Sequence, residues 1–420
     1  MEVRVLTLNC WGLPLGLSKD KHQRFQHIAK KLATGCYDIV TLQEVWDVKD
    51  YDLLQAATRV ALPHSHYFKG GFTNSGLCIF SKWPITDLHS SRFSLNGYAH
   101  KLNQLDWYAA KRVVMCQLNI EGLVANVYAT HAHALYAPSN LPEKDETLAH
   151  RLVQLFELSE YVRLTSARAD LTIVAGDFNT EPFSLAAKLV LANAGLLDAW
   201  EMRENREYND CKTNETPDNF YARGQTMYYM NTEDGERIDY ILYRSSGNAS
   251  IQCREVTLDL HDIPGTNMLY SDHTGVAATL EISPSKGQGA RGDGVEATQV
   301  SMATENETQG SKSQLADLLK EAIQLIARAQ MKSRRDRTVS FLKAVFCLSL
   351  LLVSTAFQSD AFAVRVFTLL WNCVLTLVAA FYICFGGFVK SAEMNTLAGI
   401  AEKMDHRLAQ TGVAMATNSS

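Results

Sequence analysis

Carboxylate, amide and imidazole side chains recur in six short segments, each at one end of a run of strand-forming residues. The segments are Leu8–Gly12 (LNCWG), Leu42–Trp46 (LQEVW), Thr130–His133 (THAH), Gly176–Asn179 (GDFN), Arg237–Tyr240 (RIDY) and Ser271–His273 (SDH). One such segment alone is a weak signal, because an acidic residue after a strand is most often a helix cap or a turn former. Six of them in one chain predict a site where loops from several strands meet.

These residue types suit the hydrolysis of a phosphodiester. A phosphoryl transition state needs a hard cation held by oxygen ligands, and Mg²⁺ usually takes one or two carboxylates. We expect Glu44 to be the principal metal ligand, with Asn9 and Asp272 close to it. The attacking water needs a base whose pKa lies near the working pH, and His273, oriented by neighbouring acidic groups, suits that role. The side chains expected to stabilise the leaving group and the developing charge are His131, Asn179 and Lys111.

Short apolar runs predict the strands that would position these segments. The runs are Val3–Leu8, Asp38–Gln43, Gly76–Ser81, Arg112–Leu118, Leu123–Ala129, Leu171–Ala175, Arg237–Leu242 and Gly275–Ile282. Apolar residues at every third or fourth position predict helices at Lys21–Ala33, Glu143–Thr165 and Ser184–Ala194. Many strands with few helices between them predict an α+β fold over residues 1–282, a two-sheet β-sandwich flanked by helices.

The chain changes character after Ile282. Residues 283–313 are rich in Gly, Ser, Thr and charge, which predicts a flexible linker, and residues 314–337 predict an amphipathic, basic juxtamembrane helix. The apolar stretches 339–357 and 362–388 are each long enough to cross a hydrocarbon core about 30 Å thick, and residues 389–420 would form a tail. A buried hairpin of a soluble domain is the alternative, but the linker has already ended the globular domain.

The short connection Gln358–Ala361 predicts a transmembrane hairpin whose outer ends lie on one side of the membrane. By the positive-inside tendency the basic residues at those ends place them, and the catalytic domain, in the cytosol. We therefore expect a multi-pass integral membrane protein of the endoplasmic reticulum or another intracellular membrane, with the plasma membrane as an alternative. The basic residues, which would also attract an anionic lipid surface, are Lys332, Arg334, Arg335, Arg337 and Lys390.

The composition narrows the class of partner. The 420 residues carry a formal net charge of −5, without the basic balance of a nucleic-acid binder, so no nucleic-acid partner is expected. The nine cysteines include no CxxC pair, which predicts reduced thiols. The N-terminal apolar run is interrupted by Glu2 and Arg4, so it predicts a first strand and no secretory signal.

LNCWG, LQEVW, GDFN, RIDY and SDH, in this order, resemble the motifs of the DNase I-like endonuclease/exonuclease/phosphatase superfamily over about residues 1 to 282. The resemblance implies a DNase I-like sandwich in which Glu44 is the metal-binding glutamate and His273 the general base. It also implies that Asp177 and Asn179 position water and phosphate and that Asp239 supports the catalytic histidine.

By the same resemblance His131 faces the leaving group. His133 lies two residues further on, so either histidine of THAH could enter the site.

Further features make the chain similar to neutral sphingomyelinases of the two-helix type. The resemblance implies an Mg²⁺-dependent enzyme that hydrolyses sphingomyelin, its membrane lipid substrate, to ceramide and phosphocholine, and it also implies activity on lysophospholipids such as lyso-platelet-activating factor. The features are Trp11, Trp46, Ser75–Lys82 (SGLCIFSK), Leu95–Tyr98 (LNGY) and the two apolar stretches.

Asp106 and Lys111 lie five positions apart in DWYAAK. They resemble an Asp–Lys switch pair that controls the conformation of an active-site loop in related enzymes. An ion pair on the protein surface is the equally weighted alternative.

Three other functions stay open. A DNA-repair nuclease and an inositol-polyphosphate phosphatase would use the same fold, but the net charge and the hairpin argue against the first, and no basic pocket supports the second. A catalytically inactive membrane scaffold is the third, and the retained carboxylates and His273 argue against it.

Overall fold

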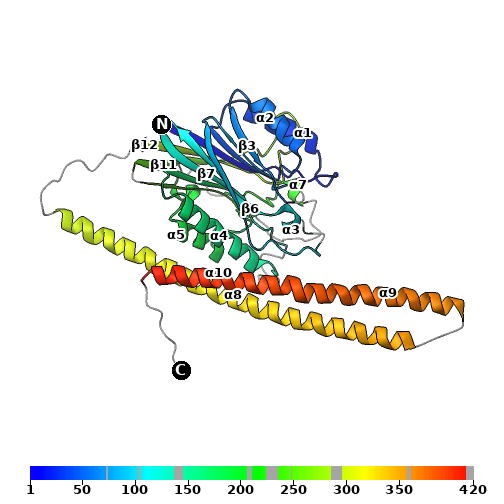
Figure 1. The fold of residues 1–420 in the computed structure, drawn as a ribbon. Coiled ribbons are helices and arrows are strands. Elements are labelled where there is room, and N and C mark those ends of the chain that lie inside the picture. Colours follow the sequence, from blue (N-terminus) through cyan, green and yellow to red (C-terminus); the bar gives the residue numbers. More distant parts are fainter. Residues whose placement is uncertain are drawn as a thin grey trace. The chain divides into compact units, whose positions relative to one another are not determined.

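The computed structural model (Figure 1) describes residues 1–71, 74–101, 104, 106–136, 145–205, 211–223, 235–246, 248–284, 296–356 and 361–412. The chain divides into two units, Met1–Leu318 and Leu319–Ser420. The first unit holds all the predicted chemistry, and the second holds most of the C-terminal helices.

Two six-stranded sheets form the first unit. One sheet runs β11 (Ala249–Asp259), β12 (Gly275–Pro284), β1 (Glu2–Asn9), β2 (Ile39–Gln43), β4 (Leu77–Ser81) and β3 (His64–Phe68). The other runs β5 (Ile85–Arg92), β6 (Arg112–Ile120), β7 (Leu123–His131), β8 (Leu171–Asp177), β10 (Asp239–Ser245) and β9 (Leu197–Asp198). This arrangement confirms the predicted two-sheet sandwich.

Apolar residues that alternate along the strands form the core between the sheets. Val5 and Ile39 of one sheet and Val127 and Ile173 of the other belong to one cluster of buried side chains. These buried side chains hold the two sheets together, and the polar residues lie at the ends of the same strands, where the loops begin.

Helices cover the outer faces of both sheets (Figure 1). Phe25 of α1 (Lys21–Leu32) and Leu54 of α2 (Val48–Thr58) are buried with Leu6 and Leu8 of β1. On the other sheet lie α4 (Leu148–Thr165) and α5 (Leu185–Ala194), and Thr165 of α4 forms a hydrogen bond of 2.7 Å with Tyr128 of β7. The short helices are α3 (Asp106–Ala109), α6 (Ala199–Met202) and α7 (Phe220–Arg223).

The predicted helix Glu143–Thr165 begins later than expected. Residues 143 and 144 lie outside the described part, and α4 starts at Leu148. The reason is local, because the Asp145 carboxylate accepts hydrogen bonds from the backbone and hydroxyl of Thr147 and holds this segment in a turn.

Strand direction brings the polar segments to one edge of the sandwich. β1 and β2 pair in parallel, as do β7 and β8, while β10 and β12 run antiparallel to β8 and β1. Asn9, His131 and Asp177 therefore end their strands where Asp239 begins β10 and where His273 precedes β12.

The second unit is a helical hairpin that holds α8 (Glu296–Ala356) from Leu319 onward, α9 (Phe362–Cys384), a π-helical turn (Phe385–Val389) and α10 (Lys390–Gln410). Ser354 donates a hydrogen bond to Asn372, and Ser333 donates to Glu393 Oε2 over 3.2 Å, so the two arms pair antiparallel along their length. The segments Gly310–Ala356 and Phe362–Gln410 are long and apolar enough to cross a membrane.

The helices also cover parts of the predicted linker and tail. Of the linker at 283–313, residues 285–295 lie outside the described part, and the backbone is helical from Glu296. In the predicted tail at 389–420, α10 extends from Lys390 to Gln410. Residues 413–420 lie outside the described part. Residues 357–360, which hold most of the predicted connection, lie outside it as well.

The close approach of β7 and β8 at the polar edge depends on Gly176. Its φ is +144°, and a Cβ there would clash with the backbone oxygen of Thr130. We expect Gly176→Ala to destabilise the first unit by about 3 kcal/mol, as overpacking at a rigid position does. Thermal unfolding of the full chain in detergent, followed by tryptophan fluorescence, measures the change.

Gly122→Ala is the matched control. Gly122 also has a positive φ, +93°, but a Cβ there meets nothing within 4 Å, so only backbone strain of about 1 kcal/mol is expected. Equal losses in the two variants would mean that the Thr130 contact contributes nothing.

Candidate active site

Asn9 links carboxylates that come from the two sheets. Its Nδ2 donates to Glu44 Oε1 and to Asp177 Oδ2, each over 3.1 Å, while its Oδ1 accepts from the backbone of Trp11. Glu44 follows β2 with a φ of +58°, a left-handed conformation that turns the chain sharply, and Trp46 Nε1 donates to Glu44 Oε2 over 3.3 Å. The amide of Asn9 therefore holds two carboxylates near one another at the polar edge.

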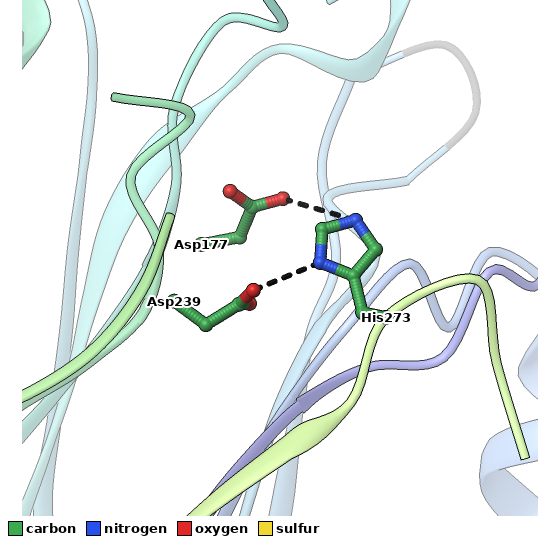
Figure 2. Close-up of side chains that lie close together, drawn as sticks. All are labelled: Asp177, Asp239 and His273. Atoms are coloured by element: carbon green, nitrogen blue, oxygen red, sulfur yellow. Dashed lines mark hydrogen bonds and ion pairs between the residues drawn. The ribbon is translucent and has the colours of Figure 1, made fainter. Parts of the chain in front are cut away.

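His273 and Asp239 form a hydrogen-bonded pair beside Asp177 (Figure 2). His273 Nδ1 lies 2.9 Å from Asp239 Oδ2, and His273 Nε2 lies 4.0 Å from Asp177 Oδ2. Burial alone would lower the pKa of His273, but Asp239, Asp177 and Asp272 outweigh it and raise that pKa well above its ordinary value. Asp239 thus fixes the ring and leaves Nε2 facing the carboxylate cluster.

His131 lies within this cluster. Its Nε2 is 3.4 Å from Asp177 Oδ2 and 3.9 Å from Glu44 Oε1. Burial, and then the nearby charge of Lys111, lowers the pKa of His131 well below its ordinary value. A neutral imidazole at this point can donate or accept a hydrogen bond but carries no charge.

His133 lies elsewhere. Its Nδ1 is 2.8 Å from its neighbour's backbone oxygen, on Ala134, and its Nε2 is 3.9 Å from Asp106. Burial lowers its pKa to about 4, although Asp106 opposes the shift. The structure therefore brings His131 to the carboxylates of Glu44 and Asp177, whereas His133 lies near Asp106.

Asp106 and Lys111 form a buried ion pair. Lys111 Nζ lies 3.2 Å from Asp106 Oδ1, and the two side chains are 4% and 3% exposed, so the alternative of a surface ion pair is wrong. Lys111 also donates to the oxygen of Ala132 over 3.1 Å, and Asn179 Nδ2 donates to the same oxygen over 3.0 Å. The pair is thus joined through one carbonyl to the segment that carries His131 and Asn179.

The oxygen-rich cluster suits a hard divalent cation. Burial, and then Asp239, raises the pKa of Asp177 to about 7, while burial and Glu44 raise that of Asp272 to about 6, although His273 opposes that shift. Burial and neighbouring carboxylates thus disfavour the ionised form of both groups, and a bound cation would favour it. Among the described residues, buried Asp239 Oδ1 also has no hydrogen-bond partner.

Among the residues that the structure describes, three buried side chains lie close enough together to share a metal ion. Ligand atoms of Asp177, Asp239 and His273 all lie within 4.8 Å of one another. The hydrogen bond between His273 and Asp239 already engages one nitrogen of this set. Of the predicted ligands, Asn9 contacts both Asp177 and Glu44, and Glu44 lies near enough to Asp272 to raise its pKa. Their oxygens are donors of the kind Mg²⁺ prefers.

Two positioning residues were not predicted. Arg24 of α1 is fully buried and donates to the backbone oxygens of Cys10, Trp11 and Tyr270. Thr213 Oγ1 accepts a hydrogen bond from the backbone of Asp239 over 3.3 Å. Arg24 shares the helix face of Phe25 and Ile28, and that spacing was the available signal, whereas Thr213 gave none.

Comparisons with known proteins agree with this geometry. The model of the Endonuclease/Exonuclease/phosphatase family matches residues 6–273. A protein of Caenorhabditis elegans named as a neutral sphingomyelinase is 36% identical over 416 residues, which cover 94% of this chain and 88% of that protein. Sphingomyelin phosphodiesterase 2 of Mus musculus is 34% identical over 288 residues, which cover 69% of this chain and 67% of that protein.

One solved structure shows the same fold. A beta toxin of Staphylococcus aureus has a TM-score of 0.50 at 19% sequence identity, with 66% of this chain and 99% of that chain covered.

We expect Asp106→Asn to destabilise the first unit, because it leaves the buried Lys111 cation without its ion-pair partner. A loss of about 3–5 kcal/mol is typical at neutral pH, and Asp106→Asn/Lys111→Met should recover most of it. Thermal unfolding of the three proteins in detergent measures both effects. An Asp106→Asn protein as stable as the wild type would show that the pair contributes no stability.

The same pair predicts a pH dependence. Burial alone would raise the pKa of Asp106, but His133 and Lys111 outweigh it and hold that pKa below its ordinary range. A carboxyl whose folded pKa is lowered stabilises the fold above its unfolded pKa of about 4, and the effect is lost as the pH falls further. The stability gap between wild type and Asp106→Asn should therefore be constant from pH 7 to about 5 and shrink below about 4. A gap that persists undiminished well below pH 4, where the fold survives, would contradict the assignment of that stability to the ionised carboxylate.

Proposed function

This chain belongs to the Endonuclease/Exonuclease/phosphatase family and, within it, to the neutral sphingomyelinases, and on that premise we propose that it hydrolyses sphingomyelin to ceramide and phosphocholine. One observation carries the proposal, the hydrogen bonds of Asn9 to Glu44 and Asp177 beside the pair His273–Asp239. This arrangement supports a metal site of oxygen ligands beside an imidazole that acts as the base.

His273 is the general base of the proposed reaction. A water oxygen attacks phosphorus, the bond from phosphorus to the ceramide oxygen breaks, and the proton of the water passes to His273 Nε2. Asp239 holds the opposite nitrogen, which keeps Nε2 free to accept a proton and stabilises the imidazolium that forms. The leaving ceramide oxygen takes a proton from solvent while His273 releases the proton it gained, and the neutral ring of His131 stabilises that oxygen by hydrogen bonding.

We infer that the cation is Mg²⁺, held by Glu44 and Asp272 with Asn9 beside them. A hard divalent cation there supplies charge stabilisation to the phosphoryl oxygens and offsets the carboxylate field that raises the pKa of His273. Asp177 and Asn179 position water and phosphate, because the Asp177 carboxylate contacts His131 and Asn9 and accepts the backbone N–H of Asn179 over 2.8 Å.

The membrane assignment extends the proposal. The two apolar helical segments would span the membrane as a hairpin, with the basic residues near 332–337 against anionic head groups on the cytosolic face. Lysophospholipids with the same head group are proposed as second substrates. The anchored enzyme would then meet its substrate at a raised effective concentration.

Catalysis is tested with two variants of the full chain in mixed micelles. We expect His273→Ala to lower phosphocholine release at least about 100-fold, as the loss of a general base typically does. Glu44→Ala should weaken Mg²⁺ binding, measured by calorimetry, and Glu121→Ala is its matched control, since Glu121 is also a glutamate with positive φ (+51°) but lies in an exposed turn. Undiminished turnover in His273→Ala would rule out its role as the base.

Substrate class is tested in the same assay. Sphingomyelin, phosphatidylcholine, lyso-platelet-activating factor, an inositol polyphosphate and abasic-site DNA are compared in Mg²⁺ and in EDTA. We expect Mg²⁺-dependent release of phosphocholine from sphingomyelin above all. Cleavage of DNA or of the inositol phosphate would support those alternatives, and no hydrolysis of any substrate would support the scaffold.

Topology is tested in sealed microsomes made from cells that express the chain. Trypsin added outside should degrade the first unit without detergent, because the cytosolic face is exposed to the protease. Protection of the first unit until detergent is added would place it in the lumen.

A further inference from the structure

The segment Leu13–Leu17 presents leucines to solvent directly beside the candidate site. Leu15 is 96% exposed and Leu17 is 55% exposed. Leu17 N donates to the oxygen of Pro14 over 3.2 Å, which closes a four-residue turn. Within that turn Leu15 has a φ of +59° and Gly16 a φ of +77°.

This turn is an unfavourable place for leucine. Turns with positive φ at both central residues favour Asn-Gly, since asparagine tolerates the left-handed conformation and leucine does not. A strained backbone that displays a fully exposed apolar side chain gains nothing in water. Strain of this kind points to a function of the segment.

The guanidinium of Arg24 fastens both ends of the loop to the site. Arg24 Nη2 donates to the oxygen of Trp11 over 2.7 Å, and its Nε donates to the oxygen of Lys19 over 2.9 Å. Its Nη1 donates to the oxygen of Tyr270, the residue before Ser271 and Asp272, over 3.0 Å. The tip therefore projects from a base that is joined to the candidate metal-binding segments.

A second exposed apolar side chain, that of Phe220, lies next to the same cluster. The ring of Tyr221 lies 5.3 Å from that of Trp11, and its hydroxyl donates to Asp20 at the end of the loop over 2.7 Å. Its neighbour Phe220 is 49% exposed, and the preceding Asn219 donates to the oxygen of Ser271 over 3.1 Å. Two segments distant in sequence thus carry exposed apolar groups from one packed cluster.

We propose that Leu15, Leu17 and Phe220 dock the site onto the lipid surface that contains the substrate. The inference rests on the proposed function, which requires a membrane lipid to enter between these loops. A lipid surface is the partner because the exposed apolar groups lie beside the site that would take the lipid and because the same chain carries two helices able to span a membrane. Apolar side chains beside a site sink into an interface when that burial removes them from water.

Leu15→Asn separates docking from folding. Asparagine suits the left-handed turn, so we expect the unfolding temperature to be unchanged or higher. The full chain is reconstituted in phosphatidylcholine vesicles and assayed on vesicle sphingomyelin and on the water-soluble diester 4-nitrophenyl phosphocholine. We expect the ratio of the vesicle rate to the soluble rate to fall about fivefold or more, as the loss of a leucine from an apolar contact predicts.

Val60→Asn is the matched control, because Val60 is 91% exposed and precedes β3, whose first residue lies at the opposite edge of the sheet. Its ratio should equal that of the wild type. An unchanged ratio in Leu15→Asn overturns the proposal. Equal losses on both substrates also overturn it, since the loop would then act by shaping the catalytic residues.

A second readout does not depend on catalysis. Tryptophan emission of Leu15→Trp should be quenched by brominated phosphatidylcholine more strongly than emission of the wild type or of Val60→Trp. Absence of extra quenching overturns docking, and a change in emission with protein concentration would instead assign the tip to a contact with a second copy. A wild type that hydrolyses neither substrate while Leu15→Trp is quenched would refute the proposed function and leave the docking surface supported.

Discussion

The buried cluster of carboxylates at one edge of the sandwich is the constraint on which the rest of the structure depends. Like charges removed from water repel one another and raise each other's pKa, so the fold must supply groups that hold them. Asn9 donates to Glu44 and Asp177 at once, and His273 pairs with Asp239. The negative field of these carboxylates favours a divalent cation. The surrounding amide and imidazole groups stabilise the same charge by hydrogen bonding.

The sandwich meets this constraint through strand direction. Each sheet contains one parallel pair, β1–β2 in one and β7–β8 in the other, and the chain leaves all four strands at the same edge. The hydrogen bond between Asn9 and Asp177 then closes the space between the sheets. Arg24 donates to backbone oxygens of three segments, Cys10–Trp11, Lys19 and Tyr270, so its charge lies near the carboxylates without a hydrogen bond to any of them. The backbone around the site is thus held by side-chain donors of Arg24, from the flanking helix α1, to main-chain oxygens.

The sequence predicted the elements in which local pattern and tertiary burial agree. The strands that carry the candidate site have apolar alternation and end in polar residues, so their positions could be predicted within a few residues. Of the predicted side chains, Asn9, Glu44, His131, Asp177, Asp239 and His273 lie together. β5 reads ITDLHSSR and is exposed on most of its length, so no alternation marked it, and β3 and β11 were missed as well. The helix α2, with only three buried residues, was missed too.

Sequence could not resolve features that depend on tertiary packing. His131 and His133 both follow β7, and only the positions of Asp177 and Asp106 separate their environments. The spacing of Arg24 with Phe25 and Ile28 hinted at its burial, but the backbone oxygens that receive its donors come from Cys10, Trp11, Lys19 and Tyr270, and no local pattern names them. The helical continuation through Lys390–Gln410 depends on pairing with α8, where Ser333 and Asp336 contact Glu393 and Lys390, and a polar composition does not reveal that partner.

The turn at Glu121 and Gly122 joins β6 to β7 at the opposite edge from the carboxylates, where a side chain added at Gly122 meets no other atom within 4 Å. The site residues lie at the opposite edge of the sandwich from this turn. The turn can therefore be lengthened without moving them. The molecule therefore offers a natural insertion point for a fluorescent reporter or an affinity tag. Such a fusion would let the enzyme be followed or captured in a living cell with its catalytic edge unchanged.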